Sequence, residues 1–351
     1  ILLGLALYAV GAFLCIPASS FQSFTFFCFS LYILTFGLAF LETTANPYIL
    51  SLGSKENATR RLNLAQAFNP MGSLSGMAVA SLVVLPSLMS DKHRDAAGVN
   101  HFSELAESVK AVERAHDLDV IRNAYVALGI VVLAVLVVIA LKKMPDTAAT
   151  HVHKAGTMKR LWSNVNYREG VLTQMFYVGA QIMVWTFIIQ YADNLGINKA
   201  TAQFYNIIAM SIFLGARFLS TFLMKYVNSR RLLAIFGCGA ALCTLGAICF
   251  VGTAGLVCLV AISAFMSLMF PTIYGIALED VAIEDSTLGA SFLVMAIVGG
   301  SIMPPLQGSI IDLGTVLGHP AVNVSFCLPL FCFAMIIIYG IRSYKRGLKV
   351  S

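Results

Sequence analysis

One carboxyl group lies well inside an apolar stretch of the chain, and its position suits it to carry a proton. Glu42 is the only one of the 17 Asp and Glu residues placed well inside such a stretch. A carboxylate at the bilayer centre costs about 2.5–3.5 kcal/mol, so a chain that keeps one directs it towards an interior cavity. Removal from water favours the neutral form of a carboxyl group, which suits proton uptake and release. The alternative is a carboxyl satisfied by neighbouring hydroxyl groups.

Side-chain amides follow Glu42 in the same apolar run and recur at the start of the next. Asn46 lies one helical turn after Glu42 and precedes Pro47, which frees a backbone carbonyl. The Asn46 amide offers a donor and an acceptor, and with the free carbonyl these groups can hydrogen-bond a sugar hydroxyl. Gln66 and Asn69 are three residues apart and share one helix face. These amides predict a polar cavity; a simple kink and helix–helix hydrogen bonds are the alternatives.

The second half of the chain offers an amide beside an aromatic ring. Gln181 and Trp185 are four residues apart and lie on one helix face. An indole ring suits the C–H faces of a sugar, although packing against lipid or another helix is the alternative. Phe270, before Pro271, and Tyr274 mark an interrupted helix. We therefore add these side chains to the predicted substrate site.

Two further polar residues lie nearer the ends of their apolar runs. Asn63 shares the face of Gln66 but is close to the cytoplasmic end, so it contributes less to the predicted cavity. Arg217 has two interpretations that the sequence does not separate. It can extend its charged head to water, or it can pair with an acid across a closed inner gate.

The sequence contains no pattern for enzyme chemistry or for a bound metal. It has neither a P-loop nor a nucleophile elbow. The six histidines fall in predicted loops, and the eight cysteines lie in apolar runs without a CxxC pair. We therefore predict no catalytic residues, no metal and no cofactor, with the proton as the coupling ion.

The composition places the chain in a membrane. Hydrophobic residues make up 58% of it and charged residues only 11%, against about a quarter charged in soluble domains. The net charge of +6 does not indicate a nucleic-acid partner, because the basic residues lie in short loops between apolar runs. Ten runs are long enough to cross a bilayer as helices, at 1–18, 22–51, 62–88, 121–141, 169–192, 201–224, 231–251, 254–278, 286–311 and 320–341.

The basic residues predict how these spans are oriented and divided. With Ile1 in the cytoplasm, sixteen Lys and Arg residues fall in cytoplasmic segments and six in outer ones, as the positive-inside rule requires. Residues 89–120 then form an external loop with a short surface helix over 104–119, and the C-terminus is cytoplasmic. Residues 142–168 form a cytoplasmic linker between four spans in 1–141 and six in 169–351. Because six-plus-six is the common transporter plan, we expect two leading spans to be missing.

Five stretches together resemble the fucose:proton symporter family of the major facilitator superfamily. They are GLAFLETTANPYI (37–49), RLNLAQAFNPMG (61–72), YVGAQIMVWTFIIQYA (177–192), AFMSLMFPTIY (264–274) and ASFLVMAIVGGSIMPPLQG (290–308). The glutamate in the first stretch favours the fucose branch over the glucose/galactose branch, whose segment resembles LQVAANPY. Two residues depart from the fucose transporter: Phe270 stands where it has Tyr, and Gln190 where it has Arg.

The resemblance implies an all-α polytopic fold of twelve helices, ten of them present, with alternating access around a central sugar site. It implies that Glu42 is one of two buried acids, and that Gln66 and Asn69 line the cavity. We therefore expect a monomeric proton-coupled importer of L-fucose or a related monosaccharide in the bacterial inner membrane. A glucose/galactose-type transporter and a sugar sensor that does not translocate are the alternatives.

The predicted orientation can be tested with single cysteines in a background without the native ones. Lys110→Cys should react with a membrane-impermeant thiol reagent added outside intact cells, because residue 110 lies in the predicted external loop. Lys154→Cys should react only after the cells are opened. The opposite labelling pattern would overturn the topology.

Overall fold

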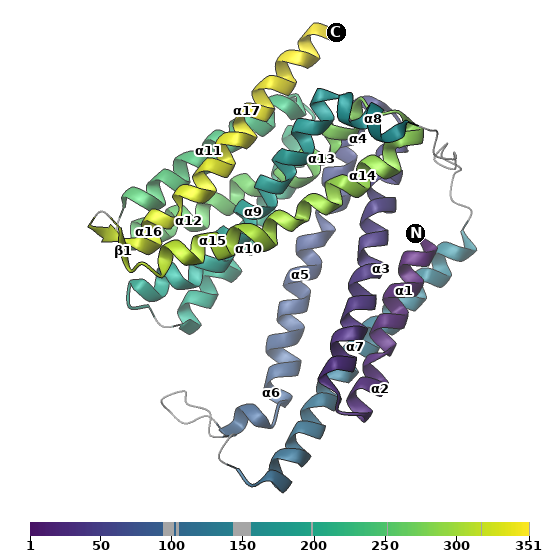
Figure 1. Cartoon of the computed structure of the whole chain (residues 1–351), viewed down its shortest axis with the longest axis vertical. Helices are drawn as coiled ribbons and strands as arrows, with labels where there is room; N and C mark the ends of the chain where they lie inside the picture. Colours follow the sequence, from purple (N-terminus) through teal and green to yellow (C-terminus); the bar gives the residue numbers. More distant parts are fainter. Residues whose placement is uncertain are drawn as a thin grey trace. The chain divides into compact units, whose positions relative to one another are not determined.

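The chain folds almost entirely into α-helices, as shown in a computed structural model (Figure 1). The structure describes residues 1–93, 102, 105–142, 156–197, 199–250, 252–316 and 318–350. Within these ranges, ten helical stretches are long and apolar enough to cross a membrane, which confirms the predicted number of spans. Helices satisfy their own backbone hydrogen bonds, so apolar segments that leave water adopt them.

Packing divides the chain into two compact units, and the first contains Ile1–Ala45 and Ser75–Asp146. It is built from α1 (Leu2–Phe13), α2 (Cys15–Ser20), most of α3 (Phe24–Ser51), the end of α5 (Phe68–Val79), η2 (Ala80–Val84), α6 (Leu85–Ser87), η3 (Ser90–His93) and α7 (Glu107–Leu141). The expected short surface helix over 104–119 is instead the beginning of α7, which continues unbroken into the membrane span. Residues 94–101, 103 and 104 of the predicted external loop lie outside the described residues.

The second unit contains Asn46–Leu74 and Thr147–Ser351, so the end of α3 and the start of α5 pack with the later helices. Its elements are η1 (Lys55–Asn57), α4 (Ala58–Gln66), α8 (Thr157–Ser163), α9 (Val165–Asn194), α10 (Lys199–Leu223), α11 (Ser229–Cys249), α12 (Thr253–Met266), α13 (Met269–Glu279), η6 (Ile283–Asp285), α14 (Ser286–Met295), η7 (Ala296–Val298), α15 (Gly299–Ile311), α16 (Ala321–Ser325) and α17 (Cys327–Val350). A two-residue hairpin, β1 (Thr315–Val316) and β2 (His319–Pro320), precedes α16.

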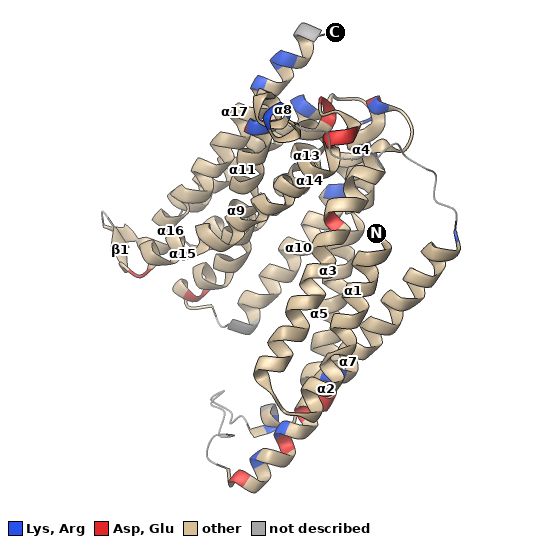
Figure 2. Ribbon diagram, turned by 45° about the vertical axis from the view of Figure 1, so that its right-hand side comes forward, with Lys and Arg blue, Asp and Glu red and all other residues tan. Residues whose placement is uncertain are grey.

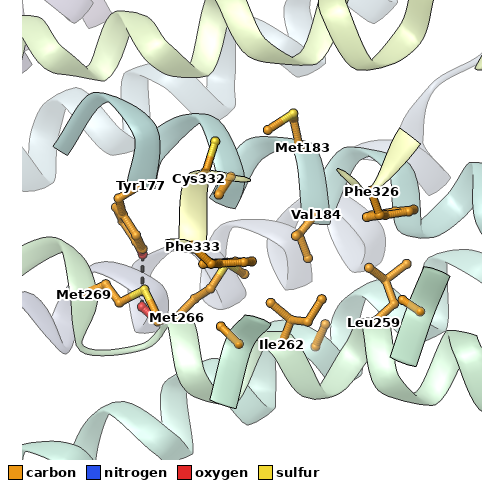
Figure 3. Packing of buried hydrophobic residues seen from close by; sticks show 14 of the residues in the cluster. Tyr177, Met183, Val184, Leu259, Ile262, Met266, Met269, Phe326, Cys332 and Phe333 are labelled. Atoms are coloured by element: carbon orange, nitrogen blue, oxygen red, sulfur yellow. Dashed lines mark hydrogen bonds between the residues drawn. The ribbon is translucent and has the colours of Figure 1, made fainter. Parts of the chain in front are cut away.

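The core of the second unit lies where α9, α12, α13 and α17 meet. Met183, Ile262 and Phe333, from three of these helices, are fully buried there (Figure 3). The Tyr177 hydroxyl donates to the Met266 carbonyl at 3.1 Å, where α12 ends. This bond satisfies a polar group inside an otherwise apolar interior.

A short helix within the predicted linker anchors it to the second unit. Residues 143–155 lie outside the described residues, but α8 follows them. Arg160 donates to both carboxylate oxygens of Asp285, from Nε at 2.8 Å and Nη2 at 2.7 Å. The hydrogen-bonded carboxylate raises the pKa of the Arg160 guanidinium. Charged residues gather at this end of the unit, around α8 and α17 (Figure 2).

The close crossing of α9 and α15 depends on a glycine. A Cβ atom at Gly299 would lie 2.1 Å from the Met175 carbonyl oxygen, so the backbones would have to separate. Gly299→Ala should therefore lower the thermal unfolding midpoint, with a cost of about 1–3 kcal/mol. Gly308→Ala, on the same helix, meets nothing nearer than 4.0 Å and is the matched control. Equal midpoints for the two variants would contradict this account.

Candidate functional site

Two prolines free backbone carbonyls at two helix breaks in the second unit. Pro70 stands four residues after Gln66, where α4 gives way to α5. Pro271 stands four residues after Ser267, between α12 and α13. Proline has no N–H, and its ring crowds the carbonyl four residues earlier. The carbonyl oxygens of Gln66 and Ser267 therefore lose their normal helical donors.

Arg217, on α10, donates to both of these carbonyl oxygens. Its Nε lies 2.5 Å from the Ser267 oxygen, and its Nη1 lies 2.9 Å from the Gln66 oxygen. The side chain is 3% exposed, so it does not extend to water. No acid within the described residues pairs with it. Both expectations for Arg217 are therefore wrong, because proline-freed carbonyls replace water and carboxylate as its partners.

A seam between α4 and α13 lies next to this arginine. We define it by Thr59 and Asn63 on α4 and by Thr272 and Gly275 on α13. The Asn63 amide, which is fully buried, donates to the Thr272 hydroxyl at 3.1 Å. A Cβ atom at Gly275 would lie 2.8 Å from the Thr59 hydroxyl oxygen, so glycine permits the close approach. Asn63 thus joins two helices, a role that its sequence position did not reveal.

Two of the predicted site residues are joined directly. The Gln66 amide donates to the Asn46 side-chain oxygen at 2.9 Å, linking the end of α3 to the end of α4. Asn46 is 4% exposed. Gln66 therefore holds Asn46 through its side chain and Arg217 through its carbonyl. Asn69, three residues further on, is exposed and has no hydrogen bond among the described residues.

A chain of aromatic contacts runs from Trp185 to Arg217. The Trp185 ring packs edge-on against Phe213 with centroids 5.0 Å apart, and the Arg217 guanidinium lies 4.6 Å from the Phe213 centroid. The indole N–H donates to the Ser263 hydroxyl at 3.3 Å, which fixes the orientation of the ring. Gln181, one turn earlier on α9, is half-buried and has no described hydrogen bond.

The remaining aromatic residues form a separate stack on α13. The Phe270 ring lies 6.4 Å from the Tyr274 ring and 6.2 Å from the Tyr177 ring of α9. Tyr274 is fully buried, whereas Phe270 is half-buried. Their approach follows from the break before Pro271, which reorients the start of α13.

Glu42 belongs to the first unit, and its position is described relative to its own helix, α3. It lies on α3 one turn before Asn46. The hydroxyl groups of Thr43 and Thr44 donate to backbone carbonyls of α3, to Ala39 and Phe40 respectively, at 2.9 and 2.7 Å. These adjacent hydroxyls are therefore engaged with the helix backbone, which weakens the alternative that they satisfy the carboxyl group.

Sequence reasoning missed Ser263, Phe213 and Thr272 as partners of the predicted residues. Pro70 and Pro271 did give a sequence signal for the partners of Arg217, because each proline frees the carbonyl four residues earlier. Nothing in the sequence showed that α10 passes both breaks.

The fold and these helix breaks are those of a polytopic membrane transporter, and comparison with known proteins agrees. Residues 1–305 match the Major Facilitator Superfamily. The L-fucose-proton symporter of Haemophilus influenzae is 59% identical in a match that covers 98% of this chain and 81% of that protein. The L-fucose-proton symporter of Escherichia coli is 32% identical, covering 97% and 77%. A crystal structure of FucP, a transporter of this superfamily, in the outward conformation has a TM-score of 0.89 and 30% identity, covering 97% and 82%.

The chain therefore belongs to the Major Facilitator Superfamily and, within it, to the family of the L-fucose-proton symporters. This confirms the family and fold expected from the sequence. The protein is a multi-pass membrane transporter and not an enzyme.

Loss of the arginine should loosen the α4–α13 seam. Hydrogen bonds from a charged group contribute about 1.5–3 kcal/mol each, so Arg217→Gln should raise the reactivity of a buried Thr59→Cys thiol more than tenfold. The rate of maleimide labelling in a background without native cysteines measures this. Arg168→Gln, which removes an exposed charge elsewhere in the unit, should leave the rate unchanged. An unchanged rate in Arg217→Gln would contradict the structural role.

Proposed function

We propose that the chain is a proton-coupled sugar symporter that imports L-fucose or a related monosaccharide by alternating access. The observation that carries this is the 59% identity to an L-fucose-proton symporter over 98% of the chain. The bacterial inner membrane is proposed from the similarity to the symporters of two bacteria, and the cytoplasmic C-terminus from the distribution of basic residues. The protein acts as a monomer in this proposal.

The proposed sugar site combines hydrogen-bonding and stacking groups. Asn46 and Gln66, already bonded to each other, present an amide pair beside the helix break. Trp185 supplies a ring fixed by Ser263, and Gln181 and Asn69 have amides free to bind hydroxyl groups. Phe270, which is half-buried, adds an aromatic ring, and the fully buried Tyr274 stacks against it. Glu42, one turn from Asn46 on α3, carries the proton and contacts the sugar.

The α4–α13 seam is proposed as the inner gate of this cycle. With the seam closed, Asn63 and Arg217 join α4 to α13 and to the end of α12. Release of sugar to the cytoplasm requires α4 to leave α13, so the Gln66 carbonyl must leave Arg217. The aromatic contacts from Trp185 to Arg217 give bound sugar a physical route by which to influence this step.

Glu42→Gln tests both the proton and the sugar parts of the proposal. The amide keeps the shape of the acid but cannot exchange a proton, so it should abolish L-fucose accumulation driven by a pH gradient across proteoliposomes. Exchange of labelled for unlabelled L-fucose needs no net proton cycle and should survive at least partly. Glu56→Gln, an exposed acid of η1, is the matched control and should accumulate L-fucose normally.

Two outcomes would reject parts of the proposal separately. Accumulation that persists in Glu42→Gln would remove the proton role and leave the transporter assignment standing. If the unmutated protein exchanges D-glucose or D-galactose but not L-fucose, the glucose/galactose type replaces the fucose type. Binding of L-fucose without any exchange would indicate a sensor.

A further inference from the structure

A pocket outside the proposed sugar site lies between α4 and the end of α10. Its volume is about 280 Å³, and it is lined by Asn57, Arg60, Arg61, Leu64, Phe218, Thr221 and Phe222. Both helices belong to the second unit and end at loops here, so the pocket opens at one edge of the membrane-spanning region.

The polar side of the pocket carries positive charge without a carboxylate partner. Arg61 donates to the carbonyl oxygens of Leu50 and Ser54, at 3.1 and 2.8 Å, so its charge is held in place but not neutralised. Arg60 is half-buried and has no hydrogen bond or ion pair among the described residues. Glu56, four residues earlier, is exposed and forms no described ion pair with Arg60. The pocket is therefore suited to an anion.

The opposite side of the pocket is apolar and open. Leu64, Phe218 and Phe222 are 50%, 42% and 54% exposed on helices that span the membrane. Beyond them, Phe222 packs edge-on against Tyr226, and the Lys225 ammonium lies 5.6 Å from the Tyr226 ring centroid. Aromatic and basic residues in this arrangement are typical of the membrane–water interface. A small soluble anion has no apolar part that could contact these side chains, whereas a lipid has acyl chains.

We propose that this pocket binds an anionic glycerophospholipid of the cytoplasmic leaflet. The Arg60 guanidinium holds the phosphodiester, because the planar fork of arginine matches phosphate geometry. The Arg61 guanidinium, which backbone carbonyls hold in place, adds a second positive charge beside it. The acyl chains lie along Leu64, Phe218 and Phe222. Basic pockets between membrane helices on the cytoplasmic side bind such headgroups. The lipid would bridge α4 and α10 one turn from Arg217, next to the proposed inner gate.

Lipid titration followed by native mass spectrometry of the detergent-purified chain tests this. Dioleoylphosphatidylglycerol should bind, and Arg60→Gln should weaken that binding about fivefold, since each basic residue near a membrane surface contributes about 1 kcal/mol. Arg231→Gln removes an exposed charge outside the pocket and should have no effect. Phe222→Glu, which places an acid in the apolar wall, should weaken binding by at least as much as Arg60→Gln. It tests the same pocket if Arg60→Gln does not fold.

Three results would overturn the proposal. Equal weakening by Arg231→Gln would indicate a general surface potential rather than a site. If glycerol 1-phosphate binds as tightly as dioleoylphosphatidylglycerol, the ligand is a soluble anion. If dioleoylphosphatidylcholine binds as tightly, the pocket does not recognise the net charge of the lipid. None of these results bears on L-fucose transport, so the inference and the proposed function fail independently.

Discussion

The buried guanidinium of Arg217 is the interaction on which the second unit depends. Bringing a cation out of water costs several kcal/mol unless it is fully hydrogen-bonded. Here two carbonyl oxygens, made available by Pro70 and Pro271, accept from it, and the Phe213 ring lies 4.6 Å away. Neither freed carbonyl has its usual helical donor, so the guanidinium supplies the missing donors and the carbonyl oxygens supply its acceptors. This pairing explains why a membrane helix keeps an arginine in the absence of a described acid partner.

The same interaction connects the proposed sugar site to the seam. Gln66 contributes its carbonyl to Arg217 and its side chain to Asn46, so one residue belongs to both. Trp185 reaches Arg217 through Phe213. A sugar that displaces either contact changes the environment of the arginine, and the strength of the seam changes with it. Coupling of this kind needs only packed side chains with two arrangements.

Much of this could be read from the sequence because membrane helices have a simple signature. Ten apolar runs gave ten spans, and the stretches around Glu42 and Gln66 gave the family. The pattern failed where contacts depend on which helices meet. The polar residues of 104–119 concealed that α7 is continuous, since a helix can emerge from the membrane without a break. Both expectations for Arg217 were wrong because its partners are backbone carbonyls. Pro70 and Pro271 mark these carbonyls in the sequence, but no pattern shows that α10 passes both helix breaks. The position of Asn63 near the end of its apolar run does not show that its amide donates to Thr272 on another helix.

The central claim is that the α4–α13 seam must open for sugar to reach the cytoplasm. A disulfide between Thr59→Cys and Gly275→Cys tests it directly. A Cβ atom at Gly275 would lie 3.2 Å from the Thr59 Cβ, close to the 3.5–4.5 Å of disulfides. We predict that the oxidised double variant, in proteoliposomes without other cysteines, binds L-fucose but does not transport it, and that reduction restores transport. Undiminished transport with the disulfide intact would contradict the account.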